Sequence, residues 1–330
     1  MALEFLGMAG QKTNRGWVGL EVSRDGIAIA HVLPTKAKQT NVQQTNAQQT
    51  NAQQTKGDRP RLSCCEFIAT EAITSTTETL RARISALGLT KVPCNWVLVN
   101  PDYNLLLVEA PKVADEELRE AMRWRIKDLI SFPVENAVLD VFPLPGDGTR
   151  GAPMSYVVVA EKNQIQDIID IADSAKIVLS SIDIGELALR NLADLVTADN
   201  RGVGLVRLRQ GQGSLALIKQ QQLYLSRQFD LPYNAGLLDE LPEENLVLEL
   251  QRSVDYYERQ LGQVPPAQLL FCGENISTDK LTESFRQSLP GKSNCLQLST
   301  LVEGAEQWEE SLLQLCAGAI GGALRQEVAA

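Results

Sequence analysis

The sequence is poor in histidine and in positive charge. His31 is its only histidine, and 31 lysine and arginine residues stand against 41 aspartate and glutamate residues, a formal net charge of −10 at pH 7. A metal site built from several histidines is therefore not expected, and His31, in an alternating strand-like segment, is expected to be structural. The acidic balance also disfavours nucleic acid as a partner, because phosphate binding needs clustered positive charge.

The sequence also lacks paired cysteines and long apolar runs. None of its six cysteines has C-x-x-C spacing, and most lie in apolar segments, which is typical of buried free thiols in a reducing compartment. The longest apolar stretch, residues 312–324, is too short to span a bilayer and is interrupted by glycines. No secretion signal is visible. We therefore expect a soluble, cytoplasmic protein.

Two segments about one domain apart, residues 16–30 and 202–217, share one pattern. Each predicts a strand, a tight polar turn containing glycine, and a second strand, and third-strand candidates follow at residues 62–69 and 223–229. This repetition indicates a duplicated fold whose halves face each other across a cleft. In such folds the two turns usually hold nucleotide phosphates through backbone N–H groups, but the side chains of these turns argue against that use.

Residues 39–55 form a five-residue repeat of glutamine, threonine and asparagine. The repeat carries no charge and almost no apolar side chains, so it cannot bury enough surface to offset the entropy of ordering it. We expect a flexible insertion between the second and third strands.

The middle of the chain predicts a separate β-α-β-β-α unit. A strand at residues 105–108 precedes an amphipathic helix at 115–130, for which Asp115 is the expected N-cap. Its apolar stripe comprises Leu118, Ala121, Met122, Ile126, Leu129 and Ile130. Strands at 138–142 and 156–160 and a second amphipathic helix follow.

Trp124 breaks the pattern of the first helix. At about 100° per residue it points away from the apolar stripe, among charged residues that include Glu117 and Glu120. Packing against a neighbouring domain is one explanation. A partner-binding surface that also includes Phe132 and Pro133 is the other.

The chain resembles the PilM family. The resemblance is carried by residues 110–142, in which EELREAMRW (116–124) and ISFPVE (130–135) are the most specific segments. It continues through residues 182–189 and 249–257 into the glycine-rich terminal stretch and so covers nearly the whole chain. PilM is the cytoplasmic actin-like protein of type IV pilus assembly. Among its relatives, the chain is most similar to the PilM-like member of the mannose-sensitive haemagglutinin (MSHA) pilus system.

The resemblance implies an α/β, actin-like fold, which is a duplicated ribonuclease-H-like fold of two domains with an inserted β-α-β-β-α subdomain. The implied units are a first half (1–100 plus 181–200), an inserted subdomain (101–180), a second half (201–230 plus 265–330) and a small helical subdomain (231–264). It also implies an adaptor at the inner face of the inner membrane. Such a protein docks the cytoplasmic tail of a single-pass PilN-like protein and contacts the membrane only through that partner; other pilus assembly proteins are further candidate partners.

The chain departs from the family where family members typically hold ATP. The first phosphate turn, usually DIGSSS, is EVSRDG at residues 21–26, and the second, usually DIGAS, is RLRQG at residues 207–211. Arg207 replaces the carboxylate that a divalent cation would need. Glu274 places a bulky anion in the adenosine segment, which is usually three glycines.

These departures predict a degenerate nucleotide cleft. Its candidate residues are Glu21, Ser23, Arg24, Asp25, Arg207, Arg209, Gly211, Glu249, Arg252, Ser253, Gly273 and Glu274. We expect Arg207 or Arg209 to approach Glu21, Asp25 or Glu274, so that internal ion pairs occupy the space of a nucleotide. Neither a cofactor nor a metal is expected.

Three functional interpretations follow. The first is a non-catalytic scaffold with an inactive cleft. The second is an ATP-binding or ATP-hydrolysing protein whose arginines replace the metal; Glu249, Arg252 and Ser253 favour it because they match a helix that touches the ribose in related folds. The third, a relative of the type II secretion L protein, is disfavoured because no membrane helix follows Ala330. No nucleophile–base pair or catalytic carboxylate pair indicates another enzyme class.

Overall fold

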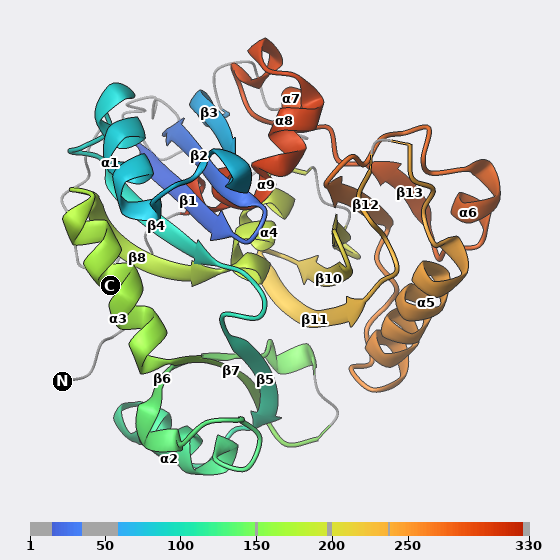
Figure 1. The fold of residues 1–330 in the computed structure, drawn as a ribbon. Helices are drawn as coiled ribbons and strands as arrows, with labels where there is room; N and C mark the ends of the chain where they lie inside the picture. Colours follow the sequence, from blue (N-terminus) through green and yellow to red (C-terminus); the bar gives the residue numbers. More distant parts are fainter. Residues whose placement is uncertain (1–14, 35–58, 149–150, 197–199, 237, 326–330) are drawn as a thin grey trace, which may run out of the picture.

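The structure, a computed structural model, describes residues 15–34, 59–148, 151–196, 200–236 and 238–325. The repeat at residues 39–55 lies outside them. The described residues form two five-stranded sheets and one three-stranded sheet. Figure 1 shows the two larger sheets side by side and the smaller sheet, with its helix, against one end of the pair.

The first glycine-turn segment forms the middle of the first sheet. Its strands in spatial order are β3 (Arg61–Ala69), β2 (Gly26–Leu33), β1 (Trp17–Ser23), β4 (Pro93–Leu98) and β8 (Val178–Ile184). β1 pairs antiparallel with β2 and parallel with β4. The sheet is apolar on both faces: one face packs on α1 (Thr76–Ala86) and α3 (Lys162–Ser174), and the other on α9 (Ala317–Ala323).

The second segment builds the second sheet in the same way. Its strands in spatial order are β11 (Gln222–Asp230), β10 (Gln212–Lys219), β9 (Val203–Arg209), β12 (Gln268–Gly273) and β13 (Lys292–Cys295). An antiparallel meander followed by two parallel strands is thus used twice. This repetition confirms the predicted duplicated, actin-like α/β fold.

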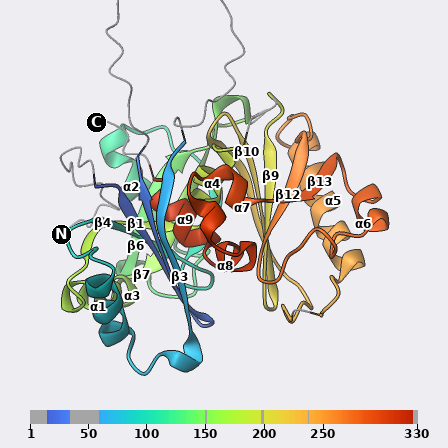
Figure 2. The same ribbon diagram turned by 90° about the horizontal axis from the view of Figure 1, so that it is seen from above.

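Further helices cover the sheets and connect them. They are α4 (Gly185–Ala193), α5 (Glu243–Arg259), α6 (Glu283–Gln287), α7 (Leu298–Leu301) and α8 (Glu310–Leu315), with 3-10 turns at Thr70–Ala72, Val134–Asn136, Gly146–Gly148 and Ala305–Gln307. α5 and α6 lie on the outer side of the second sheet, whereas α4 and α9 lie between the two sheets (Figures 1 and 2).

The inserted module consists of β5 (Asn104–Glu109), α2 (Asp115–Ile126), β6 (Ala137–Pro143), β7 (Met154–Glu161) and α3. Its strand order is β5-β7-β6. One face of this sheet packs on α2 through Met122, Ile126, Val157 and Val159. The opposite face, which includes Val158 and Ala160, joins the core of the first sheet.

The predicted first helix of the module needs two corrections. α2 ends at Ile126, not at residue 130, and its N-cap is Ala114, which makes no side-chain capping bond, so Asp115 is the first helical residue. After Ile126 the chain forms a tighter turn, in which the N–H of Leu129 donates to the carbonyl oxygen of Ile126 (2.8 Å), and Ile130 and Phe132 pack on the module core. Leu129, predicted in the apolar stripe, is consequently 55% exposed.

Two helices pack against a different unit from the one to which the sequence assigned them. α3, assigned to the inserted subdomain, packs into the core of the first sheet together with α1. α9, assigned with residues 265–330 to the second half, lies against β1, β4 and α4 of the first. Both assignments followed the order of the sequence, whereas the packing of each helix is set by partners far away in the chain.

Glycines allow α9 to approach its neighbours closely. A Cβ at Gly321 would lie 2.3 Å from the carbonyl oxygen of Ala188 in α4, and one at Gly322 would lie 2.6 Å from Cγ2 of Val97. On the facing strand, a Cβ at Gly19 would lie 1.8 Å from the carbonyl oxygen of Ala319. The small residues of this predicted core helix therefore have a packing role.

The cysteines are free, with five buried and Cys64 half-buried. His31 is buried in β2, where Nδ1 lies 2.6 Å from Oγ of Ser63 and Nε2 lies 2.8 Å from the carbonyl oxygen of Arg15. Among the described residues, no helix has the length and apolarity needed to cross a membrane.

Replacing Gly321 with alanine tests the close packing of α9. The added methyl would overlap the backbone of Ala188, so we expect Gly321→Ala to lower the free energy of unfolding by about 1–3 kcal/mol, despite the better helix propensity of alanine. Denaturant unfolding measures this change. Gly151→Ala is the control, because a Cβ at Gly151 meets no atom within 4 Å. Equal stability of the two variants would contradict the packing argument.

Candidate functional site

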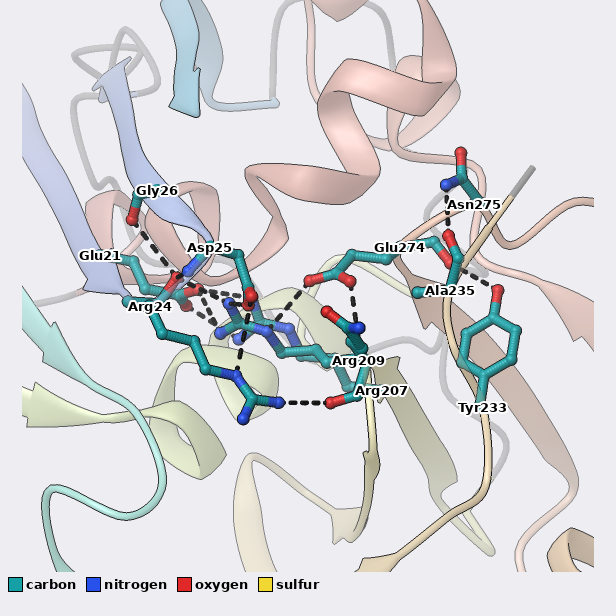
Figure 3. Close-up of polar contacts among 12 residues, drawn as sticks. Glu21, Arg24, Asp25, Gly26, Arg207, Arg209, Tyr233, Ala235, Glu274 and Asn275 are labelled. Atoms are coloured by element: carbon teal, nitrogen blue, oxygen red, sulfur yellow. Dashed lines mark hydrogen bonds and ion pairs between the residues drawn. The ribbon is translucent and has the colours of Figure 1, made fainter. Parts of the chain in front are cut away.

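Charged residues of the two glycine turns meet between the two large sheets. Glu21 and Asp25 come from β1 and its turn, and Arg207 and Arg209 come from β9, as Figure 3 shows. At the rim, Nη2 of Arg24 donates to the carbonyl oxygen of Gln210 (2.7 Å), so the two turns also touch directly. The cleft is therefore bridged by the residues that the sequence singled out.

The innermost bridge is a bidentate pair. Nη1 and Nη2 of Arg207 donate to Oε2 and Oε1 of Glu21 at 2.8 and 2.7 Å. The two side chains are only 8% and 3% exposed. Gly318 of α9 packs over the pair, and a Cβ there would lie 1.7 Å from Oε2 of Glu21. The ion pair and α9 can therefore lie side by side only because residue 318 has no side chain.

Arg209 extends the cluster toward the rim. Its guanidinium donates to Glu21 (3.1 Å), Asp25 (2.7 Å) and Glu274 (3.3 Å), and also to Oγ of Ser23 (2.7 Å). Three carboxylates from both halves therefore converge on two guanidinium groups. The predicted ion pairs are confirmed; we call Glu21, Asp25, Arg207, Arg209 and Glu274 the ionic cluster.

The cluster shifts the pKa values of its buried members toward their charged forms. Burial is the largest single influence on the pKa of Glu21 and by itself would raise it. The attraction of Arg207 and Arg209 and the hydrogen bonds from Arg207 together outweigh burial, so the pKa of Glu21 lies below the ordinary 4.5. Burial would likewise lower the pKa of Arg207, but Glu21 raises it above its ordinary value. Both groups are charged at neutral pH.

The backbone donors of the second turn are already used within the chain. The N–H of Gly211 donates to the carbonyl oxygen of Tyr233 (2.8 Å), and the N–H of Gln210 donates to Oε2 of Glu274 (3.3 Å). A phosphate at this turn would need such N–H groups. The turn therefore offers fewer free donors than a phosphate-binding turn requires.

Residues 273–275, which the family resemblance compares with an adenosine segment, are also hydrogen-bonded to other parts of the chain. The buried Tyr233 donates its hydroxyl to the carbonyl oxygen of Glu274 (2.8 Å), and Nδ2 of Asn275 donates to the carbonyl oxygen of Ala235 (2.6 Å) (Figure 3). Gly273 has φ +121°, and a Cβ there would lie 2.0 Å from the carbonyl oxygen of Leu208. Sequence reasoning missed Tyr233, because no motif links it to this segment.

The three candidate residues on α5 do not join the cluster. Arg252 pairs with Glu249 at 3.0 Å on the helix surface. Ser253 is buried and donates to the carbonyl oxygen of Glu249 (2.6 Å). These interactions are local to one helix, so the predicted cleft residues separate into an ionic cluster and an α5 group.

A donor set of this kind does not fit a magnesium-bound triphosphate. The cation would need carboxylate or other hard oxygen ligands, but each carboxylate of the ionic cluster is bound by a guanidinium. The cavity beside Arg207, lined also by Tyr103, Glu186 and Gln228, has a volume of about 60 Å³, well below the roughly 300 Å³ of a small-molecule site. Larger cavities adjoin the turns on the rim side of the cluster: one of about 320 Å³ is lined by residues 22–25, Asp102, Arg209 and Gln210, and one of about 470 Å³ by Arg24, Asp25, Gly211 and Tyr233 among others.

A second polar junction was not found from the sequence. The buried Glu186 of α4 accepts hydrogen bonds from the hydroxyl of Tyr103, from Oγ of Ser226 (3.2 Å) and from Nε2 of Gln228 (2.9 Å). It thereby joins the first half, the start of the inserted module and β11 of the second half. Residues this far apart in the sequence carry no local signal of their contact.

The predicted partner surface lies on the inserted module. Trp124 is 60% exposed, which excludes the interpretation that it seals a domain interface within the described chain. Glu117, Glu120 and Pro133 are exposed as well. Phe132 differs: it is half-buried against the module core, so little of its ring is available to a partner.

Comparison with known proteins shows the fold. No family model and no curated protein matches the chain. The PilM–PilN type IV pilus biogenesis complex contains a similar structure, with a TM-score of 0.68 and 17% identity over 94% of this chain and 98% of that one. The cytoplasmic domain of EpsL, an inner membrane component of the type II secretion system of Vibrio cholerae, has a TM-score of 0.48 and 14% identity over 91% and 92% of the two chains.

Removing the charge of Glu21 tests the ionic cluster. Glu21→Gln leaves Arg207 buried with a partner that has no charge, so we expect it to lower the free energy of unfolding by about 3–5 kcal/mol. Glu249→Gln is the matched control, because its pair with Arg252 is exposed and contributes about 0–1 kcal/mol. Urea unfolding of both variants measures the difference. Similar losses would show that the buried pair contributes no more than a surface pair.

The lowered pKa of Glu21 predicts that the stability difference between the wild-type protein and Glu21→Gln depends on pH. Because the pKa of Glu21 is lower in the folded state, its ionisation stabilises the fold fully above the unfolded value near 4.5, and this stabilisation is lost as pH falls through the lower folded value. The stability difference between the wild-type protein and Glu21→Gln should therefore be constant near neutral pH and shrink in acid. A difference that grows on acidification would contradict this sign.

Proposed function

We propose that this protein is a non-catalytic adaptor of a type IV pilus assembly machine. In this proposal it docks the cytoplasmic tail of a PilN-like inner-membrane protein and works in the cytoplasm, at the membrane face to which that partner brings it. Two findings support it: the full-length likeness to the PilM–PilN complex, and the sequence segments shared with PilM. The narrower assignment to an MSHA-type machine rests on the sequence segments alone.

One observation carries the non-catalytic part of the proposal. The Glu21–Arg207 pair occupies the deepest part of the cleft between the phosphate turns, at 2.7 and 2.8 Å. A triphosphate bound there would have to displace Glu21 from Arg207. Its negative charge would also be repelled by the three carboxylates of the ionic cluster. In this proposal the protein binds no ATP, and ion pairs between its own residues join its two halves.

The exposed Trp124 supports the docking part of the proposal. Its large aromatic surface is 60% exposed, and burying an aromatic anchor with a few aliphatic side chains is sufficient for micromolar affinity. The nearby Glu117 and Glu120 favour a tail that carries lysine or arginine, chiefly through a faster association rate.

Binding of the tail tests the function directly. A synthetic peptide spanning the cytoplasmic tail of a PilN-like protein should bind the full chain with micromolar affinity, and ATP with magnesium should leave that affinity unchanged. Calorimetric titration with and without ATP measures both. A peptide with the same composition in scrambled order is the control. Failure of the native peptide to bind would contradict the adaptor function.

Substitution of Trp124 tests the anchor. Because the side chain is exposed, Trp124→Ala should leave the melting temperature nearly unchanged, while tail affinity falls by about tenfold or more. Leu238→Ala, which removes an apolar side chain that is 93% exposed and lies before α5, should bind the tail normally. Unchanged affinity of Trp124→Ala would show that the tail binds without this residue.

A further inference from the structure

β5 is an edge strand of the module sheet, and its register shows which of its backbone groups point outward. The strand order is β5-β7-β6, so β5 pairs only with β7. The N–H of Ala110 donates to the carbonyl oxygen of Pro153, in register with Leu106 opposite Val157. Because pairing alternates along an antiparallel ladder, the N–H and C=O groups of Leu105, Leu107 and Glu109 point away from β7.

Three other edge strands, β6, β11 and β3, are each covered in part by groups of the chain itself. On β6, Nη1 of Arg123 donates to the outward carbonyl of Ala137 (2.9 Å), and Pro143 at the other end has no N–H. On β11, the hydroxyl of Tyr156 donates to the carbonyl oxygen of Tyr224 and accepts from the N–H of Ser226, both at 3.2 Å. On β3, the N–H of Leu62 donates to the carbonyl oxygen of Glu303 (2.8 Å).

β5 has none of these protections. Within the described ranges, no hydrogen bond reaches the outward groups of Leu105, Leu107 or Glu109. The strand is rich in leucine, its four central side chains are only half-buried, and it contains no proline, lysine or bulge. An edge strand of this kind pairs readily with another extended chain.

The residues around β5 indicate which side chains an added strand would carry. Leu105 and Leu107 face the cores of the two large sheets, whereas Leu106 and Val108 face the core under α2. A strand added to β5 would continue both layers and could bury apolar side chains on either face. The exposed Glu109 ends the strand, and the first turn of α2 adds three acids, Asp115, Glu116 and Glu117.

We propose that an extended segment of the partner's cytoplasmic tail binds as an additional strand along β5. Main-chain hydrogen bonds to Leu105, Leu107 and Glu109 give the affinity, alternating apolar side chains give the register, and a lysine or arginine of the tail meets the acids beyond Glu109. Figure 1 shows β5 at the margin of the module sheet, where such a strand would add. This inference rests on the proposed function and specifies the binding mode of the tail.

Amide hydrogen exchange of the full-length protein, followed by NMR, tests the mode. When the synthetic tail peptide binds, the amides of Leu105, Leu107 and Glu109 should become protected, while those of Leu106 and Val108, already bonded to β7, should change little. If the peptide binds and the three outward amides exchange as before, the tail docks elsewhere, and this inference fails while the adaptor function stands. If the peptide does not bind, both fail.

A variant that removes one outward donor provides a second test. Glu109→Pro deletes an N–H that β7 does not use, at a strand end where the preceding residue is already extended. Tail affinity should fall about tenfold below that of Glu109→Ala, which removes the same charge but keeps the N–H. Equal affinities of the two variants would overturn the inference.

Should Glu109→Pro lose its native circular dichroism spectrum, backbone methylation of the peptide decides instead. N-methyl groups on one alternate set of tail residues should abolish binding to the wild-type protein, while those on the other set are tolerated. Equal effects of the two sets would overturn the strand-addition mode.

Discussion

The buried pair of Glu21 and Arg207 determines how the two halves of this molecule fit together. Taking two charges out of water costs several kcal/mol each, and the attraction offsets that cost only when geometry and hydrogen bonding are nearly complete. Here Nη1 and Nη2 of Arg207 each donate to one carboxylate oxygen of Glu21, and of this pair's polar atoms only the buried Nε of Arg207 lacks a hydrogen-bond partner within the described chain. The pair also fixes the distance between β1 and β9, because either charge would be left buried alone if the strands moved apart.

Neighbouring features follow from this constraint. α9 can pass beside the pair only because Gly318 has no side chain, and the same helix uses Gly321 to contact α4. Glycine lowers helix propensity by about 1 kcal/mol relative to alanine, so this sequence trades helix stability for close packing between the halves. The Glu186 junction lies in the same interface, joining both halves to the start of the module. Polar contacts thus bridge the cleft at two depths.

Local patterns made much of this predictable. The glycine turns showed the duplication because the strands of a hairpin are neighbours in sequence, and the opposite charges of residues 21–25 and 207–209 predicted ion pairs once the turns were expected to face each other. Trp124 was correctly placed away from its helix stripe by helical periodicity. Contacts set by distant partners could not be predicted: the end of α2 at Ile126, the packing of α9 on the first sheet, and Tyr233 against residues 274 and 275. The free edge of β5 likewise depends on strand order.

The central claim is that internal ion pairs bridge the cleft between the two glycine turns and leave no site there for ATP. A ligand that binds only the folded state raises the melting temperature by an amount that grows with its concentration relative to its dissociation constant. The most direct measurement is therefore the melting temperature of the wild-type protein over increasing concentrations of ATP with magnesium, at constant ionic strength. The account predicts no rise up to millimolar nucleotide. A melting temperature that rises steadily with the logarithm of ATP concentration would contradict it.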